Sequence, residues 1–193
     1  MTWLVAGLGN PGDEYADTRH NVGAMVVEEL AHRAGERLRR QRFVPADAAE
    51  FDADGERVVV ARAHGYMNES GPAYAGLARK RDVEPATLIA VHDELDLPFG
   101  ALQLRTGGGA AGHNGLRSLI GALGTPEFLR VRIGIGRPPG RQDPADFVLE
   151  PFGKRERDDA VALVDEAADA VLAIVREGLS RAQDRYNRSG PRA

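Results

Sequence analysis

The chain has 193 residues, of which 42% are hydrophobic and 28% charged, with a formal net charge of -4 and no cysteine. This length and composition fit one core of ordinary size, and they exclude a disulfide framework, a thiolate metal site and a cysteine nucleophile. The amino-terminal segment has no basic leader and its apolar run is too short to span a membrane, so we expect a soluble cytoplasmic protein.

The first predicted element is a buried strand over residues 2–8, which are apolar, partly β-branched and bounded by glycine. The turn that follows, GLGNPG, matches the dinucleotide fingerprint Gly-x-Gly-x-x-Gly, so a nicotinamide-dependent oxidoreductase is one alternative. In that fold the glycines open a helix directly, whereas here residues 13–20 come before any helical periodicity. We therefore favour a tight strand-to-loop turn that uses glycine dihedrals.

A helix is predicted to begin at Asn21, its N-cap, and to end at Gly35. His20 then lies beside a helix amino terminus, where the dipole disfavours the imidazolium and helps to keep the ring neutral and able to accept a proton. The basic run 37–42 could contact phosphate, but such runs are more typical of a solvated face.

The middle of the chain predicts a hairpin and then a second helix. Residues 48–63 form the hairpin, because Asp54-Gly55 is a strong turn signal between two strand-like runs. The helix covers about residues 69–81, and Asn68 has an ordinary explanation as its cap.

An acidic segment follows the next predicted strand, residues 87–92. Asp93, Glu94 and Asp96 lie at its carboxyl end, where open α/β sheets present their sites. With His92 they could suggest a divalent metal, yet the chain has no metal-binding histidine spacing such as His-Glu-x-x-His. We therefore expect no metal.

The second half of the chain combines a glycine-rich segment with an excess of arginine. Residues 106–115 carry five glycines, which suit a mobile loop or close approach of backbone to a ligand, and Asn114 can cap a helix over residues 115–123. Residues 128–135 alternate as a half-buried strand does, and a long amphipathic helix covers about residues 154–176. The local excess of positive charge, a possible phosphate footprint, comprises Arg105, Arg117, Arg130, Arg132, Arg137 and Arg141.

These elements predict an α/β fold: a single domain with a twisted mixed β-sheet flanked by α-helices on both sides, and the site at the strand ends. The hairpin shows only that the sheet is not wholly parallel.

Five motifs in this order resemble those of bacterial-type peptidyl-tRNA hydrolases, over about residues 3–152. They are GLGNPG with Thr-Arg-His-Asn, Tyr-Met-Asn-x-Ser-Gly, His-Asp-Glu-Leu-Asp-Leu-Pro, Gly-Gly-Gly with Gly-His-Asn-Gly, and Arg-Ile-Gly-Ile-Gly-Arg-Pro. The chain departs from the family in two places: Arg62-Ala63-His64-Gly65 replaces a frequent Lys-Pro-x-Thr, and Arg105 replaces a frequent lysine.

The resemblance implies a hydrolase of translation that cleaves the ester between a peptide's carboxyl end and the terminal ribose of tRNA, which recycles the tRNA. It implies His20 as general base on water, oriented by Asp93 in the manner of a triad carboxylate. Activated water suits this chain, since none of its few serines lies in a Gly-x-Ser-x-Gly elbow. The helix dipole and Asp93 pull the pKa of His20 in opposite directions, and the sequence leaves their balance open.

The resemblance also implies a set of substrate contacts. Asn10 joins His20 and Asp93 as a catalytic residue that distinguishes blocked from free aminoacyl ends, and Asn68 and Asn114 hold the substrate, the carbonyl region or the water. The expected contacts to tRNA are Tyr15, Tyr66, His113, Arg105 and Arg132, with Arg130 a further candidate.

The remaining expectations concern organisation and partners. Residues 1–180 form the catalytic domain, and 181–193 a basic, frayed carboxyl-terminal tail. The enzyme is expected to be a metal-independent, cofactor-free monomer without membrane contact, whose partner is the acceptor end of peptidyl-tRNA.

One further class stays open besides the oxidoreductase. An RNA-binding module without turnover, such as family members adapted to group II intron splicing, would keep the arginine surface. It would not need His20 and Asp93 to be coupled, so intact His20, Asn10 and Asp93 favour the enzyme.

Overall fold

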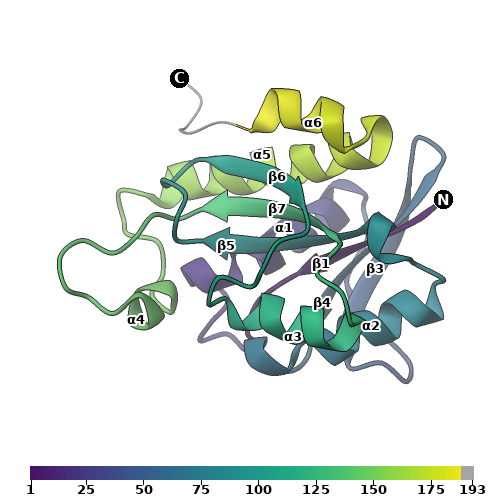
Figure 1. Cartoon of the computed structure of the whole chain (residues 1–193), viewed down its shortest axis with the longest axis horizontal. Coiled ribbons are helices and arrows are strands. Elements are labelled where there is room, and N and C mark those ends of the chain that lie inside the picture. The colour runs from purple at the N-terminus through teal and green to yellow at the C-terminus, as the bar shows by residue number, and fades with distance from the viewer. Residues whose placement is uncertain (188–193) are drawn as a thin grey trace.

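The computed structural model describes residues 1–187, and within them seven strands form one mixed sheet in the order β2-β3-β4-β1-β5-β7-β6 (Figure 1). The strands are β1 (Thr2–Gly7), β2 (Arg39–Arg40), β3 (Ala46–Ala53), β4 (Glu56–Ala63), β5 (Leu88–Glu94), β6 (Leu102–Thr106) and β7 (Leu129–Gly134). The α-helices are α1 (Val22–Arg33), α2 (Gly71–Lys80), α3 (Asn114–Leu123), α4 (Pro144–Val148), α5 (Arg157–Glu177) and α6 (Leu179–Tyr186). Three short 3₁₀ helices complete the described chain: η1 (Arg19–Asn21), η2 (Met67–Glu69) and η3 (Pro85–Thr87).

The centre of the sheet is parallel and its margins are antiparallel. β1 pairs in parallel with β4 and β5, and β5 pairs in parallel with β7. The predicted hairpin is confirmed as β3 and β4, and β2 and β6 are added antiparallel at the two edges. The carboxyl ends of β1, β4, β5 and β7 therefore meet at one edge of the molecule, the edge that carries the site.

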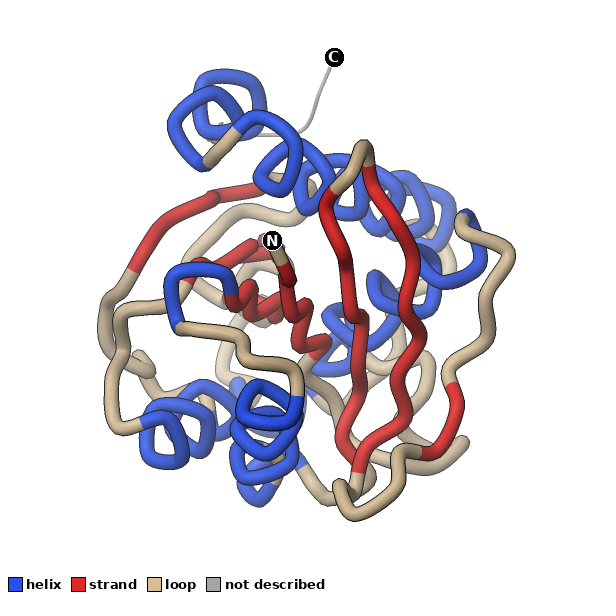
Figure 2. Tube along the Cα trace, turned by 90° about the vertical axis from the view of Figure 1, so that its right-hand side faces the viewer, coloured by secondary structure: helices blue, strands red, loops and turns tan. Residues whose placement is uncertain are grey.

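Helices cover both faces of the sheet, which confirms the predicted α/β class (Figure 2). Helices α1, α5 and α6 pack on one face, and α2 and α3 pack on the other. β1 is buried on both faces, which explains why its sequence is apolar without alternation. No helix among residues 1–187 is long and apolar enough to cross a bilayer.

Two glycines let α1 approach the sheet closely. A Cβ atom on Gly23 would lie 2.0 Å from the carbonyl oxygen of Val91 in β5, and one on Gly7 would lie 2.5 Å from the carbonyl oxygen of Gly23. Any side chain at either position would push the helix away from the strands. The start of α1, and with it His20, can therefore lie directly over the end of β5.

A buried tyrosine joins two strand ends on the other face. The Tyr74 hydroxyl of α2 donates to the carbonyl oxygen of Gly7 at 2.7 Å and accepts from the backbone N–H of Ala63 at 3.1 Å. Burial raises the pKa of Tyr74, so the hydroxyl keeps its proton. This bond fixes the start of the turn that carries Asn10.

Part of the segment expected to be a frayed carboxyl-terminal tail is helical. Residues 181–186, expected to be frayed, belong to α6, where Ala182 and Tyr186 are buried. The prediction of a frayed tail was wrong for these residues. The arginines of the segment indicated a solvated tail, although Ala182 and Tyr186 pack into the core. Asn187 accepts a hydrogen bond from the backbone N–H of Leu104 in β6, and residues 188–193 lie outside the described residues.

Candidate active site

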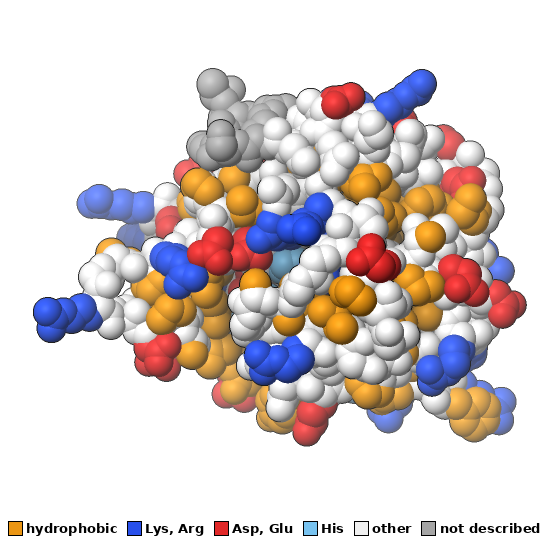
Figure 3. All heavy atoms as spheres, viewed as in Figure 1, with side chains coloured by type: hydrophobic (Ala, Val, Ile, Leu, Met, Phe, Trp, Pro, Cys, Tyr) orange, Lys and Arg blue, Asp and Glu red, His pale blue; other side chains and the backbone are white. Residues whose placement is uncertain are grey.

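Eight predicted site residues from four separate segments line one cleft of about 520 Å³ at the carboxyl ends of the parallel strands. Figure 3 shows a histidine at the bottom of a hollow in this face, with basic side chains above it and acidic side chains beside it. Predicted residues that line the cleft are Asn10, Tyr15, His20, Tyr66, Asn68, Asp93, His113 and Asn114.

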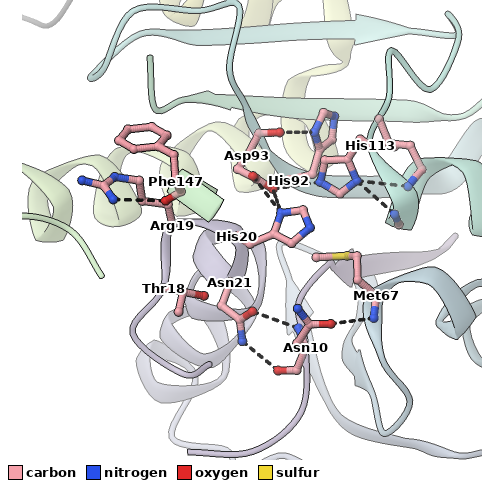
Figure 4. Close-up of polar contacts among 12 residues, drawn as sticks. Asn10, Thr18, Arg19, His20, Asn21, Met67, His92, Asp93, His113 and Phe147 are labelled. Atoms are coloured by element: carbon pink, nitrogen blue, oxygen red, sulfur yellow. Dashed lines mark hydrogen bonds and ion pairs between the residues drawn. The ribbon is translucent and has the colours of Figure 1, made fainter. Parts of the chain in front are cut away.

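His20 and Asp93 are joined as the resemblance implied, although 73 residues separate them. His20 Nδ1 lies 2.8 Å from Asp93 Oδ2 and 3.0 Å from Oδ1 (Figure 4). A carboxylate only accepts hydrogen bonds, so Nδ1 carries the proton and Nε2 of the neutral ring is left as a base. The His20 side chain is 12% exposed and that of Asp93 is 2% exposed, so the pair is largely shielded from water.

His113 makes contacts different from those predicted for it. Its Nε2 lies 2.8 Å from Asp93 Oδ1, while its Nδ1 accepts hydrogen bonds from the backbone N–H groups of Gly115 and Leu116. His113 is thus the N-cap of α3, a role expected of Asn114. Because Nδ1 accepts, the Nε2 proton is fixed and is donated to Asp93.

The tautomer of His92, next to Asp93 on β5, is fixed in the same way. Its Nδ1 donates to the carbonyl oxygen of Asp93 at 2.8 Å, and its ring meets the His113 ring edge-on at a centroid distance of 5.1 Å. Burial, with His113 nearby, lowers the pKa of His92 to about 3. The ring is therefore neutral, and the cluster contains one carboxylate and no permanent cation.

His20 binds a proton more readily than an isolated imidazole does. Burial lowers the pKa of His20, but attraction and hydrogen bonding to Asp93 outweigh burial and hold that pKa above its usual value. At Asp93 burial acts in the other direction and raises the pKa. The attraction and hydrogen bonds of His20 and His113 outweigh burial and hold the pKa of Asp93 well below its usual range. Asp93 therefore outweighs burial at His20.

The acidic side chains at the carboxyl end of β5 and just beyond it do not converge on one point. Asp93 faces the two imidazoles, Glu94 pairs with Arg132 at 3.0 Å, and Asp96 pairs with Arg137 at 2.8 Å. The three acidic side chains therefore do not form the metal site considered from the sequence.

Among the described residues, the group closest to a metal-binding geometry is His20, Asp93 and His113, with one ligand atom of each within 4.8 Å of the others. The chemistry of this set fits a metal poorly, because His113 Nε2 carries its proton and both Asp93 oxygens already accept hydrogen bonds.

Asn10 is held by Asn21, for which the sequence predicted only a role as a helix cap. The Asn21 side chain accepts from the backbone N–H of Asn10 at 2.9 Å and donates to its carbonyl oxygen at 2.8 Å. The side-chain oxygen of Asn10 accepts from the Met67 N–H at 2.7 Å, which leaves its NH₂ group on the His20 side (Figure 4). Asn21 makes no capping bond, so the sequence signal for a cap concealed a positioning contact.

The rim of the cleft carries the predicted aromatic and amide groups. Tyr15 and Tyr66 meet edge to face at 6.3 Å, and Tyr66 is half exposed. Asn68 lies in η2 rather than at a helix cap, and Asn114 is the first residue of α3, so both amides are exposed. Asn68 and Asn114 are thereby available to a substrate.

Three arginines expected to contact tRNA, Arg105, Arg130 and Arg132, lie outside the lining of the cleft, whereas Arg137 of the predicted phosphate footprint lines it. Two of the three are engaged within the fold. Arg132 pairs with Glu94 and contacts Gln103. Arg130 is buried, and its guanidinium donates to the carbonyl oxygens of the glycine-rich loop, including Gly109 at 2.6 Å. Arg105 is exposed, and its side chain makes no ion pair among residues 1–187.

Arg19 is a residue of the site region that the sequence analysis passed over. Its buried guanidinium lies 4.0 Å from the centre of the Phe147 ring, donates to the Phe147 carbonyl oxygen and pairs with Glu156 at 3.1 Å. These contacts tie η1 to α4, whose residues Pro144, Ala145 and Val148 line the cleft. Nothing in the sequence around Arg19 signals partners 128 and more residues away.

Comparison with known proteins gives one consistent result. A family model described as peptidyl-tRNA hydrolase matches residues 4–192. The chain is 55% identical to the peptidyl-tRNA hydrolase of Nocardia farcinica over 184 residues, which cover 95% of each chain. It is also 55% identical to that of Frankia casuarinae over 185 residues, which cover 96% of this chain and 93% of the other. The crystal structure of peptidyl-tRNA hydrolase from Acinetobacter baumannii matches with a TM-score of 0.91 and 34% identity, over 99% of this chain and 97% of that one.

Proposed function

This chain belongs to the peptidyl-tRNA hydrolase family, and we propose that its ester hydrolysis is carried out by water that His20 activates, with Asp93 as the orienting carboxylate. The overall reaction is cleavage of the ester that joins a peptide to tRNA, giving free tRNA and free peptide. The proposal rests chiefly on the bond from His20 Nδ1 to Asp93, because it leaves Nε2 unprotonated in the cleft.

In the proposed reaction, His20 Nε2 takes a proton from water while the water oxygen attacks the ester carbonyl carbon. The imidazolium that forms is stabilised by the adjacent Asp93 carboxylate. The tetrahedral intermediate then expels the ribose oxygen, which takes the proton back from Nε2. The carbonyl oxygen carries negative charge between these steps, and exposed amide N–H groups of Asn68 and Asn114 suit its stabilisation.

His113 and Asn21 act through other residues in this scheme. His113 donates a further hydrogen bond to Oδ1 of Asp93, which restrains the carboxylate from rotating away from His20. Asn21 fixes the backbone of Asn10, whose free NH₂ group would contact the blocked aminoacyl end. We assign both as positioning residues.

The finer partner assignments are also proposals. The acceptor end of the tRNA lies against Tyr15 and Tyr66, where a ring can stack on an unpaired base. Arg105 is the arginine beside the glycine-rich loop that is free for phosphate. The protein acts in the cytoplasm as a monomer, and its catalytic domain extends beyond residue 180 to include α6.

The experiment is single-turnover release of tRNA from N-acetyl-aminoacyl-tRNA by the parent and by His20→Ala, with EDTA present. Loss of a general base lowers the rate by about 10²–10⁴-fold, so we expect near-complete loss of cleavage in the variant while tRNA binding persists. Unblocked aminoacyl-tRNA should be spared. A folded parent that binds tRNA but cleaves no ester would overturn the mechanism, and inactivation of the parent by EDTA would overturn its independence of metal.

A further inference from the structure

Residues 37–45 form a basic projection at the edge of the sheet opposite β6, which we call the arginine ridge. Its four arginines are all exposed, and within residues 1–187 none of their guanidinium groups makes an ion pair. They are Arg37, Arg39, Arg40 and Arg42. Unlike Arg130 and Arg132, whose guanidinium groups are bonded within the fold, these cations are free to meet a partner.

The ridge also displays an aromatic ring in an unfavourable backbone conformation. Phe43 is 87% exposed and has φ of 65°, a region that bulky side chains rarely occupy. The Arg42 guanidinium lies 4.7 Å from the centre of its ring. An exposed ring held with backbone strain costs folding free energy, which indicates that something other than folding keeps it there.

The ridge is held in place by its other residues. Leu38 packs against one hydrophobic core and Val44 against the other. Lys80 donates from Nζ to the carbonyl oxygen of Arg42 at 2.9 Å, and the backbone N–H of Gln41 donates to Ala46 at 2.9 Å. Arginines and ring are thus presented by a fixed turn, and the short strand β2 is seen beside the long hairpin in Figure 2.

We infer that the arginine ridge is a second RNA-binding surface. It binds the phosphate backbone of the tRNA at a site distant from the ester, and Phe43 stacks on an accessible base or ribose. This inference rests on the tRNA substrate of the proposed function. Free guanidinium groups bind phosphate, and an exposed ring beside them is the combination that holds unpaired nucleotides. Peptides of varied sequence carry no constant charge, whereas every tRNA carries phosphates, so RNA is the partner that an arginine cluster always meets.

The ridge includes the edge strand β2, and the register of the sheet places it at the same end of the strands as the catalytic cleft. Arg40 pairs with Asp47, and Ala46 at the start of β3 pairs with Ala63 at the end of β4. Asp47 and His64 line a second cavity of about 270 Å³, and Asn10 lines both this cavity and the cleft. β2 is three strand spacings from β1, about 15 Å, a distance that a bound tRNA easily covers.

Edge strands often carry charge simply to prevent sheet-to-sheet aggregation, which would explain the arginines without RNA. Charge reversal separates the two explanations, because glutamate also protects an edge but repels phosphate. An acidic protein partner is a third explanation, and it would leave the affinity for tRNA unchanged.

The test compares Arg40→Glu with Arg181→Glu, a matched reversal at an exposed arginine of α6. Fluorescence anisotropy gives the Kd for deacylated tRNA over a range of salt concentrations. Single-turnover cleavage is measured on N-acetyl-aminoacyl-tRNA and on the same ester carried by a trinucleotide. We expect Arg40→Glu to weaken tRNA binding about tenfold at low salt and to lower the slope of log K against log salt by about one. Cleavage of the trinucleotide ester should be unchanged.

Phe43 is tested by two substitutions with opposite expectations. Phe43→Tyr keeps the ring and should keep the affinity for tRNA. Phe43→Gly removes the ring and relieves the positive φ, so it should weaken tRNA binding about tenfold while raising Tm by a few degrees. A variant that is more stable but binds less RNA is not explained by damaged folding.

Several results would overturn the inference. An unchanged Kd and salt slope in Arg40→Glu would leave edge protection or an acidic protein partner as the explanation. Equal losses in Arg40→Glu and Arg181→Glu would indicate a general charge effect, and equal losses on tRNA and trinucleotide esters would indicate damage to the cleft. Failure of the parent to cleave either ester would contradict the proposed function instead, while the anisotropy measurements would still decide the ridge.

Discussion

The histidine cluster, which comprises His20, His92, Asp93 and His113, differs from the arginine ridge in burial and in pairing, although both lie at the same end of the strands. In the cluster, Asp93 and its two imidazole partners are mostly buried, and hydrogen bonds fix their tautomers. On the ridge, the charged groups are exposed and their guanidinium groups make no ion pair within residues 1–187. Chemistry requires atoms held at fixed separations, whereas phosphate binding requires charge that solvent and ligand can reach. The fold buries the first set of polar groups and leaves the second exposed, without ion-pair partners among residues 1–187.

Asp93→Asn should give the largest effect, because it removes the charge on which the cluster depends. The amide no longer stabilises the imidazolium and can favour the wrong tautomer of His20, so we expect kcat to fall by about 10³–10⁴-fold. Single-turnover cleavage measures this fall. The matched control is Asp47→Asn, since Asp47 and His64 form a second His–carboxylate pair at 2.7 Å. Equal effects of the two substitutions would contradict a special role for the buried cluster.

The pH dependence of the cleavage rate also tests the effect of Asp93 on His20. In the proposed mechanism His20 must be neutral, and its pKa is raised, so the rate should fall on acidification from a point above the ordinary value of about 6.5. Any residual activity of Asp93→Asn should show this acidic limb at lower pH, because the attraction that raises the pKa is gone. The measurement is single-turnover rate against pH. A limb that does not move would show that another group titrates.

His113→Asn tests whether this ring positions Asp93 or binds tRNA. Loss of a hydrogen bond to a buried charge costs about 1.5–3 kcal/mol, so we expect kcat to fall by about tenfold to a hundredfold with little change in KM. The Kd for deacylated tRNA should stay the same. A raised Kd with unchanged kcat would support the contact between His113 and tRNA expected from the sequence.

Tyr74→Phe should affect stability rather than chemistry. The substitution leaves the Ala63 N–H and the Gly7 carbonyl oxygen without their buried partner, at a cost of about 1–3 kcal/mol in the free energy of unfolding. Urea unfolding measures the loss. A large fall in kcat without a fall in stability would mean that Tyr74 sets the position of Asn10 more tightly than the strands do.

The smallest effect is expected at the second His–carboxylate pair. His64→Gln should change kcat by less than about twofold, because His64 lines the other cavity and touches no residue of the histidine cluster. This position also lies in the segment where the chain departs from the usual family motif. A marked fall in kcat would show that the two cavities work together.

Local sequence patterns predicted the elements well where neighbours along the chain decide the structure. The hairpin at Asp54-Gly55 is one example, and the strand expected over residues 87–92 and found as β5 (Leu88–Glu94) is another, because turn dihedrals and apolar runs are local signals. The coupling of His20 to Asp93 came from the resemblance, since no spacing predicts contact across 73 residues.

The errors and omissions have one physical cause. Asn114 was expected to cap α3 because asparagine is a better cap than histidine in general, but His113 caps while it bonds to Asp93. Asn21 and Arg19 were passed over as positioning residues because their partners come from other segments. Residues 181–186 look basic, yet two of them pack into the core. In each case a tertiary contact decides what a local pattern leaves open.

The close approach of α1 to the sheet also has a consequence for how this protein can vary. Gly7 and Gly23 carry no functional group, yet a methyl group at either position would separate His20 from Asp93. In a saturation library selected for cleavage, these two positions should therefore be as depleted of substitutions as position 20. A map of mutational tolerance would then mark them as part of the active site, although they never meet the substrate.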